Sequence, residues 1–135
     1  MEKVSVRKLD HSNLHIQCDS GVAQELNEFF SFYVPGYKFM PAYRNRMWDG
    51  KIRLFGRMTG ELPAGLIHHL VQFCKIRDYL IEFHETDYGL PYEQEKVDEG
   101  DINSFCDSLQ LPFVVRDYQF VAVKHGLEKK RAILL

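Results

Sequence analysis

The sequence lacks the features that mark several large classes of protein. Its three cysteines, Cys18, Cys74 and Cys106, are odd in number, widely spaced and outside any Cys-x-x-Cys pair, which favours reduced core thiols over a disulfide framework. No stretch approaches the roughly 20 apolar residues of a membrane span, and the N-terminus has no signal-peptide character. We therefore expect a soluble, cytoplasmic protein with no membrane contact.

Motifs for catalysis and metal binding are also missing. The adjacent His68 and His69 would point about 100° apart on a helix, and no i, i+4 histidine pair with a third ligand is present. Asp49 alone is too little for the divalent-cation site of a nuclease. The glycine-rich phosphate loop ending in Gly-Lys-Ser or Gly-Lys-Thr is absent. We expect no catalytic residue, no metal, no cofactor and no ATP hydrolysis within these 135 residues.

Net charge is small, −2, but it is unevenly distributed. Residues 36–58 carry six basic side chains against the single acid Asp49, a net charge of +5, so the rest of the chain carries −7. Residues 85–101 hold seven acidic side chains and one lysine. The near-neutral net charge is therefore the sum of a basic block and an acidic block.

Hydrophobic periodicity predicts an α+β fold. Alternation predicts strands at 3–9 and 14–18 joined as a hairpin, then near 37–40, 51–55 and 79–83. A helix is expected to begin after Asp19 or Ser20 and to end at Val34-Pro35-Gly36, with an apolar face of Val22, Leu26, Phe29, Phe30 and Tyr33. This order favours a small, mainly antiparallel sheet with helices on one face, which leaves the other face open.

Further helices are expected towards the C-terminus. One begins at Pro63 and presents Leu66, Leu70, Phe73 and Cys74. After an acidic linker, Asp101 is expected to cap a short helix that ends at Leu111-Pro112. A final helix follows Arg116, and the apolar residues 132–135 are expected to form a strand.

The basic block contains candidate nucleic-acid contacts. The period of two in residues 51–55 places Ile52 and Leu54 inward and gives Lys51, Arg53 and Phe55 the other face. Cations suit phosphates, and an exposed ring suits an unpaired base. The full candidate set is Lys38, Arg44, Arg46, Trp48, Lys51, Arg53, Phe55 and Arg57, with Tyr37 and Tyr43 as further aromatic groups.

A structural interpretation competes with this one. A charged outer face on a half-buried strand is ordinary solubility chemistry. Trp48, beside Asp49-Gly50, suits packing over a tight turn better than contact with DNA.

Arg116, Tyr118 and Gln119 form a second candidate site, for adenine. A Gln amide donates to adenine N7 and accepts from N6–H, while Tyr118 or Arg116 would lie against the base. A Tyr-Gln pair at a helix start is common, so the adenine-site hypothesis depends mainly on the apolar helix and strand that follow this pair. This order of a candidate adenine-reading Gln, a helix and an apolar strand resembles the start of a superfamily 2 helicase motor.

Several segments resemble one known family. Residues 39–44, Phe-Met-Pro-Ala-Tyr-Arg, and 48–54, Trp-Asp-Gly-Lys-Ile-Arg-Leu, are similar to the N-terminal signature of UvsW-type superfamily 2 DNA helicases of T-even-like bacteriophages. Residues 29–32, 62–66 and the pair Tyr118-Gln119 also match. The resemblance covers the whole chain, and the Trp-Asp-Gly run is its most specific part.

The resemblance implies a domain plan. Residues 1–84 would form the α+β nucleic-acid-recognition domain, 85–112 an acidic linker with a short helix, and 113–135 the beginning of a RecA-like motor that stops before its phosphate loop. The whole protein would be an ATP- and Mg²⁺-dependent helicase in the cytoplasm of the bacterial host.

Its implied substrates are branched or duplex DNA and RNA–DNA hybrids in replication, recombination and repair, with replication or recombination proteins as further partners. A protein-interaction module that positions the motor is the alternative. A steep fall in affinity with rising salt would favour DNA contact.

Overall fold

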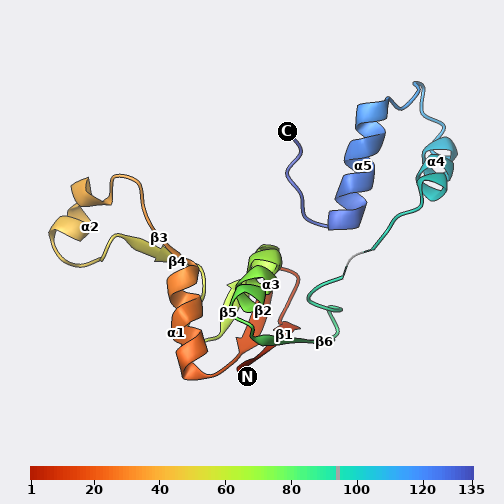
Figure 1. Cartoon of the computed structure of the whole chain (residues 1–135). Coiled ribbons are helices and arrows are strands. Elements are labelled where there is room, and N and C mark those ends of the chain that lie inside the picture. The colour runs from red at the N-terminus through yellow and green to blue at the C-terminus, as the bar shows by residue number, and fades with distance from the viewer. Residues whose placement is uncertain (94) are drawn as a thin grey trace. The chain divides into compact units, whose positions relative to one another are not determined.

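The computed structural model describes residues 1–93 and 95–135. The chain divides into two compact units, Met1–Tyr92 and Glu93–Leu135, which Figure 1 shows in a single colour gradient. No helix among the described residues is both long enough and apolar enough to cross a membrane.

The first unit is built on a four-stranded mixed sheet in the order β5-β2-β1-β6. Strands β1 (Lys3–Lys8) and β2 (Asn13–Gln17) form the predicted antiparallel hairpin. Strand β5 (Glu61–Pro63) pairs antiparallel with β2, whereas β6 (Leu80–His84) pairs parallel with β1. The expected antiparallel character holds for two of these pairings, and β5 was not anticipated because it has only three residues.

One face of the sheet carries the hydrophobic core. Val6 lies opposite both Ile16 and Phe83 in the two registers, so inward side chains from neighbouring strands share a face. Helices α1 (Ser20–Phe29) and α3 (Ile67–Ile76) supply the other half of the core. The buried core residues are Val4, Val6, Leu14, Ile16, Val22, Leu26, Phe30, Phe55, Leu62, Ala64, Ile67, Leu70, Phe73 and Cys74.

Helix α1 begins as predicted but ends earlier. The Asp19 carboxylate accepts a hydrogen bond from the Gly21 N–H at 2.8 Å, which caps the first turn. The helix ends at Phe29 instead of at Val34, because Ser31–Tyr33 forms strand β3 and pairs with β4 (Lys51–Arg53). Tyr33, expected on the apolar helix face, is therefore an exposed strand residue.

Two further predictions between these strands were wrong. Residues 37–40 were expected as a strand, but Tyr37–Phe39 is the 3₁₀ helix η1. Residues 41–45 were expected to be irregular, but Pro41–Arg44 forms the short helix α2, with the proline at its first position. In Figure 1, β3 and β4 connect the end of α1 to α2, which lies away from the four-stranded sheet.

The second predicted helix is divided in two. Pro63 ends strand β5, the 3₁₀ helix η2 covers Ala64–Leu66, and α3 follows directly. The predicted apolar positions Leu70, Phe73 and Cys74 are buried.

The first unit extends beyond the predicted boundary at residue 84. Thr86 Oγ1 donates to the Lys8 carbonyl at 3.1 Å, and Lys8 Nζ donates to the Tyr88 carbonyl at 3.2 Å. The Tyr92 ring stacks on Phe83 with centroids 5.7 Å apart. Residues 85–92 therefore belong to the first unit, because these contacts fasten them to the sheet.

The second unit contains helices α4 (Glu99–Ser108) and α5 (Asp117–Lys129). The α4 cap is Asp98, which accepts from the Gly100 N–H at 3.2 Å, rather than the predicted Asp101. Lys124 pairs with Glu99 at 2.8 Å and links the two helices. Residues 132–135 form no strand and are exposed, so that prediction was wrong. No other strand occurs among the described residues of the second unit to supply backbone partners.

Candidate nucleic-acid interface

The basic block folds into a projecting arm, which we define as residues 31–53. Its base is a two-stranded ladder in which Ser31 lies opposite Arg53 and Tyr33 opposite Lys51. Directly opposed residues in an antiparallel pair share a face, so Tyr33, Lys51 and Arg53 line one side. The expectation that Lys51 and Arg53 share a face agrees with this register.

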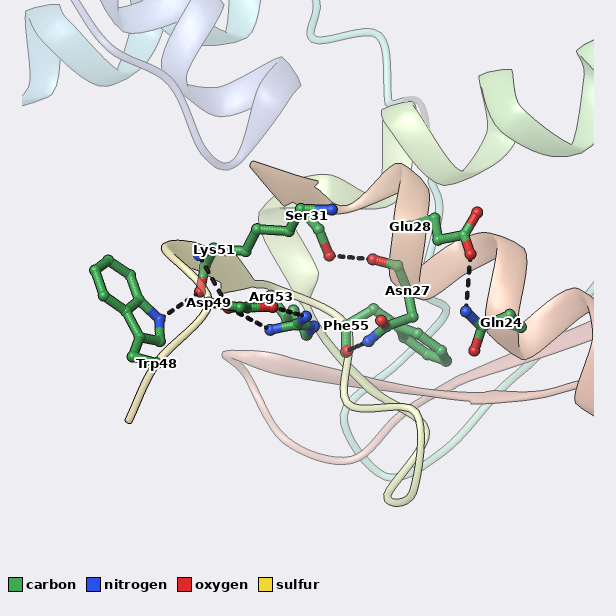
Figure 2. Close-up of polar contacts among 9 residues, drawn as sticks. All are labelled: Gln24, Asn27, Glu28, Ser31, Trp48, Asp49, Lys51, Arg53 and Phe55. Atoms are coloured by element: carbon green, nitrogen blue, oxygen red, sulfur yellow. Dashed lines mark hydrogen bonds and ion pairs between the residues drawn. The ribbon is translucent and has the colours of Figure 1, made fainter. Parts of the chain in front are cut away.

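The C-terminal end of α1 holds the arm in place. Asn27 Nδ2 donates to the Phe55 carbonyl at 3.0 Å, and the Ser31 hydroxyl donates to the Asn27 carbonyl. The Leu54 N–H donates to the Phe30 carbonyl at 2.9 Å. Figure 2 shows the two Asn27 bonds side by side at the junction. Both strands of the arm are thus bonded to one helix end.

A tight turn before β4 places the Trp-Asp-Gly run. Gly50 has φ +85°, in the left-handed region that favours glycine, and its carbonyl accepts from the Val34 N–H at 2.9 Å. The Trp48 indole N–H donates to the Lys51 carbonyl at 2.9 Å. Trp48 is half-buried and lies outside the hydrophobic core, so it fastens this turn and does not cap the core.

The single acid of the arm is engaged by a neighbouring cation. Arg53 donates through both terminal nitrogens to the Asp49 carboxylate, a bidentate ion pair drawn in Figure 2. The Lys51 N–H also donates to Asp49, at 3.1 Å. The hydrogen bonds from Arg53 and then from Lys51 lower the pKa of Asp49 to about 2, so Asp49 and Arg53 largely neutralise each other.

Three tyrosines form a chain of ring contacts along the arm. Tyr33 stacks on Tyr37 with centroids 4.8 Å apart, and Tyr37 meets Tyr43 edge-on at the same distance. Lys51 Nζ lies 4.9 Å from the Tyr33 centroid and Lys38 Nζ lies 5.9 Å from that of Tyr37. Both lysines therefore place their ammonium groups over the face of an aromatic ring, within the range of cation–π attraction.

An open hollow lies where α2 meets the turn. Its lining residues are Tyr43, Arg44, Arg46, Met47, Trp48 and Asp49, and its volume is about 510 Å³. The Arg46 N–H donates to the Tyr43 carbonyl at 3.0 Å, and Arg46 itself has φ +57°. The hollow thus brings together two of the predicted aromatic groups and two of the predicted arginines.

Two candidates do not lie on the arm surface. Phe55 was expected to present an exposed ring, but it is only 1% exposed and belongs to the core. The reason is that β4 ends at Arg53, so the period of two does not extend to Phe55. Arg57 is exposed and lies in the following turn, in a recess beside β2 that is lined also by His15 and Gln17. It therefore belongs to another region of the surface.

One feature of the arm was missed by the sequence patterns. Phe32 and Ile52 oppose each other on the second face of the ladder, and both are about half exposed. With the nearby Phe29 they form an apolar surface. The alternation in 51–55 assigned Ile52 to the core, and only the shortness of the strand argued against it.

The predicted adenine residues lie at the start of α5. The Gln119 Oε1 atom accepts from the Arg116 backbone N–H at 3.0 Å, which satisfies one free donor of the helix N-terminus. The Gln119 amide NH₂ group makes no hydrogen bond within the described residues. Tyr118 and Arg116 are exposed. Elsewhere in the described chain, no three His, Cys, Asp or Glu side chains converge as a metal site requires.

Comparison with known proteins gives one consistent family. The family described as "DNA helicase UvsW, N-terminal" matches residues 3–84. The ATP-dependent DNA helicase uvsW of Enterobacteria phage T4 is 31% identical in an alignment 138 residues long, which includes 97% of this chain and 26% of that protein. The chain therefore spans about a quarter of the length of this relative.

Solved structures agree with the sequence match. A crystal structure of the UvsW helicase from bacteriophage T4 has a TM-score of 0.81 and 30% identity, over 97% of this chain and 46% of that one. A second T4 UvsW crystal structure gives the same TM-score and identity over 96% of this chain and 26% of that one. The chain belongs to the UvsW family of DNA helicases, in which it corresponds to the N-terminal domain.

Proposed function

We propose that the first unit is a DNA-recognition domain of an ATP-dependent helicase and that the arm is its contact surface. The observation that carries this proposal is the set of cations without a carboxylate partner. Among the described residues, ion pairs engage Arg53 on the arm but none of Lys38, Arg44, Arg46 and Lys51. Unpaired cations at a projecting surface release counterions when they meet phosphates.

The binding mode is recognition of backbone and shape. The arm offers lysines and arginines, which act chiefly on phosphates, and its helix α2 has only four residues, too short for a recognition helix that spans the major groove. We therefore propose branched or duplex DNA and RNA–DNA hybrids as substrates of the whole protein. Replication, recombination and repair in the host cytoplasm would be its setting.

For the second unit we propose the beginning of the RecA-like motor. Support comes from the T4 relative, which aligns with 97% of the chain, and from the free amide NH₂ of Gln119 at the start of α5. This group fits the donor that adenine N7 needs, with Tyr118 exposed beside it to stack on the base. ATP and Mg²⁺ would serve the whole protein. Here only adenine contacts from Arg116, Tyr118 and Gln119 are proposed.

Titration of a fluorescent forked DNA with the full chain, followed by anisotropy at several salt concentrations, tests the DNA proposal. Lys51→Gln and Arg44→Gln should each lower affinity and reduce the salt slope by about 0.9 for each phosphate that the variant no longer neutralises. Lys75→Gln, at an exposed lysine of α3 outside the arm, is the matched control and should change neither. Equal reductions in all three variants would remove the arm from the proposal.

The apolar face of the arm favours the alternative, a protein-interaction module. Phe32 and Ile52 are 47% and 43% exposed on adjacent strands, and contiguous exposed apolar patches are a feature of protein-interaction sites. If lowering the salt gives no DNA binding while Ile52→Lys abolishes association with the rest of a helicase motor, the interaction module becomes the preferred function.

A further inference from the structure

The hollow between α2 and the turn has a composition unlike the rest of the arm. It combines two aromatic rings, Tyr43 and Trp48, with two guanidinium groups, Arg44 and Arg46. Aromatic faces stack on unpaired bases, and guanidinium groups bind the phosphates that join them. A duplex offers its phosphates on the outside but keeps its base faces stacked inside. The rings would therefore be of use only to an unpaired base.

The aromatic walls are held in fixed positions. The Trp48 indole N–H is bonded to the Lys51 carbonyl at 2.9 Å, and the Tyr43 ring is held edge-on by Tyr37 at 4.8 Å. Because both ring planes are fixed before any ligand arrives, little side-chain freedom is lost on binding.

The backbone that carries Arg46 is held in a defined conformation. Arg46 has φ +57°, a conformation that non-glycine residues rarely adopt. Its backbone N–H donates to the Tyr43 carbonyl, and this hydrogen bond closes the turn. The next residue, Met47, donates to the Ala42 carbonyl at 2.9 Å. Backbone strain of this kind is concentrated at functional sites.

The one acidic group in the lining does not oppose an anionic ligand. Asp49 is held by the bidentate pair with Arg53, so its charge is compensated on the side of β4. Arg44 and Arg46 have no such partner among the described residues and leave the hollow electropositive. Its volume of about 510 Å³ is of the size of small-molecule sites, which span about 300–1,000 Å³.

We propose that this hollow binds one unpaired nucleotide of a DNA or RNA strand, with the base against Trp48 and Tyr43 and the flanking phosphate on Arg44 or Arg46. The inference rests on the proposed function, since it assumes that the arm meets nucleic acid. It adds to that function a preference for sites where a strand is open, such as a fork or the end of a hybrid.

Trp48 is the only tryptophan of the chain, so its fluorescence reports on the hollow directly. The full chain is titrated with a short oligo-dT, with a blunt duplex of matched charge, and with an oligo-dT of the same length that carries abasic residues. We expect quenching of Trp48 by oligo-dT, and little quenching by the duplex or the abasic strand, although both bind by anisotropy. Stacked bases quench the indole, whereas phosphates alone do not.

Two variants separate the hollow from the fold. Trp48→Leu should weaken oligo-dT binding about tenfold or more while changing duplex binding little, as expected when one base stack is removed. Arg46→Asn keeps a residue that tolerates the left-handed backbone and should lower oligo-dT affinity without lowering thermal stability. Lys75→Gln is again the control.

Failure of the nucleotide site and failure of the proposed function give different results. If both oligo-dT and duplex bind by anisotropy but quench Trp48 equally or not at all, the nucleotide site is overturned and the DNA-recognition function stands. Equal quenching by normal and abasic oligo-dT also overturns it, because phosphate binding alone would then explain the signal. If neither nucleic acid binds at low salt, the proposed function itself fails.

Discussion

The Tyr37 ring lies directly against Gly50, so that a Cβ atom on Gly50 would be 2.3 Å from Tyr37 Cδ2. The two residues come from opposite sides of the arm, one from η1 and one from the turn before β4. Their contact closes the arm between its two strands. Two features require glycine at position 50: its positive φ and the closeness of the Tyr37 ring.

Replacing Gly50 with alanine should therefore destabilise the arm more than the same change at Gly36. Gly36 also has a positive φ, +74°, but nothing lies within 4 Å of the added Cβ. Gly36→Ala should cost only the left-handed strain of about 1–2 kcal/mol, whereas Gly50→Ala must also displace Tyr37. Hydrogen exchange at the Val34 amide, which bonds to the Gly50 carbonyl, measures the difference. Equal exchange rates in the two variants would contradict the role of the ring.

The Asp49 carboxyl should titrate far below an ordinary aspartate. Hydrogen bonds from Arg53 lower its pKa to about 2 from the usual 3.8, so the folded state binds this proton less tightly than the unfolded state. The stabilisation is fully present above pH 3.8 and is lost as the pH falls through about 2.

Carboxyl-carbon NMR of Asp49 tests this in the wild type and in Arg53→Gln. The variant should raise the pKa of Asp49 towards 3.8, because the guanidinium that contributes most to the lowered value is gone. Arg57→Gln, outside the arm, should leave it unchanged. A wild-type pKa near 3.8 would mean that the pair is open in solution.

Phe55 and Phe39 offer a matched pair for the burial of aromatic rings. Phe55 is 1% exposed and Phe39 78% exposed. Phe55→Ala should lower the free energy of unfolding by about 3–5 kcal/mol because it leaves a core cavity. Phe39→Ala should stay within about 0.5 kcal/mol, as for most surface substitutions. Urea unfolding followed by circular dichroism measures both, and a larger effect at Phe39 would contradict the assigned burial.

The three thiols should react at different rates with an aromatic disulfide reagent. Burial raises the pKa of Cys74 to about 11, so little thiolate forms there at pH 8, and its side chain is also inaccessible. Cys18 and Cys106 are only half-buried and should react first. Cys74 should react only on unfolding, with Cys74→Ala as the control that removes the slow phase. Three fast thiols in the native protein would contradict this packing.

Alkaline pH should reduce the contribution of buried Cys74 to the stability of the folded state. Because the folded pKa of Cys74 lies above its ordinary value of 9.0, its contribution to stability is present below pH 9 and is lost as the pH rises through about 11. The free energy of unfolding is compared between the wild type and Cys74→Ala from pH 9 to about pH 11. The difference separates the contribution of Cys74 from that of the tyrosines.

Long periodic segments allowed the central layer of the fold to be predicted from the sequence. The β1–β2 hairpin, the start of α1 at Asp19 and the apolar face of α3 all follow from regularly spaced apolar residues. These elements each bury one continuous face, so the pattern and the packing agree.

Short elements escaped prediction because three residues carry no period. The apolar spacing of α1 continues through Phe30 to Tyr33, yet pairing with β4 converts Ser31–Tyr33 into a strand. Similarly, the alternation from Lys51 was extended two residues past the end of β4, which placed the Phe55 ring outside. In both cases the pairing of β3 with β4 determines where the element ends, and a local sequence pattern gives no information about this pairing.

The candidate site was predicted in composition but not in arrangement. The basic and aromatic residues of 36–53 do gather on one arm, whereas Arg57 belongs to another turn and Phe55 to the core. The bidentate contact between Arg53 and Asp49 leaves Arg53 paired with a carboxylate. This contact could be identified only from the geometry of the turn in the structure. DNA contact itself stays a prediction.

The parallel pairing of β1 with β6 has a consequence for synthesis on the ribosome. Val4 lies beside Ile81, and Val6 beside Phe83, so β1 pairs on this edge with the last strand of its unit to be translated. Until β6 emerges, one edge of β1 has no partner, and contacts between such distant residues close slowly. The nascent hairpin should thus remain incompletely protected from proteases until residues beyond 84 have left the exit tunnel.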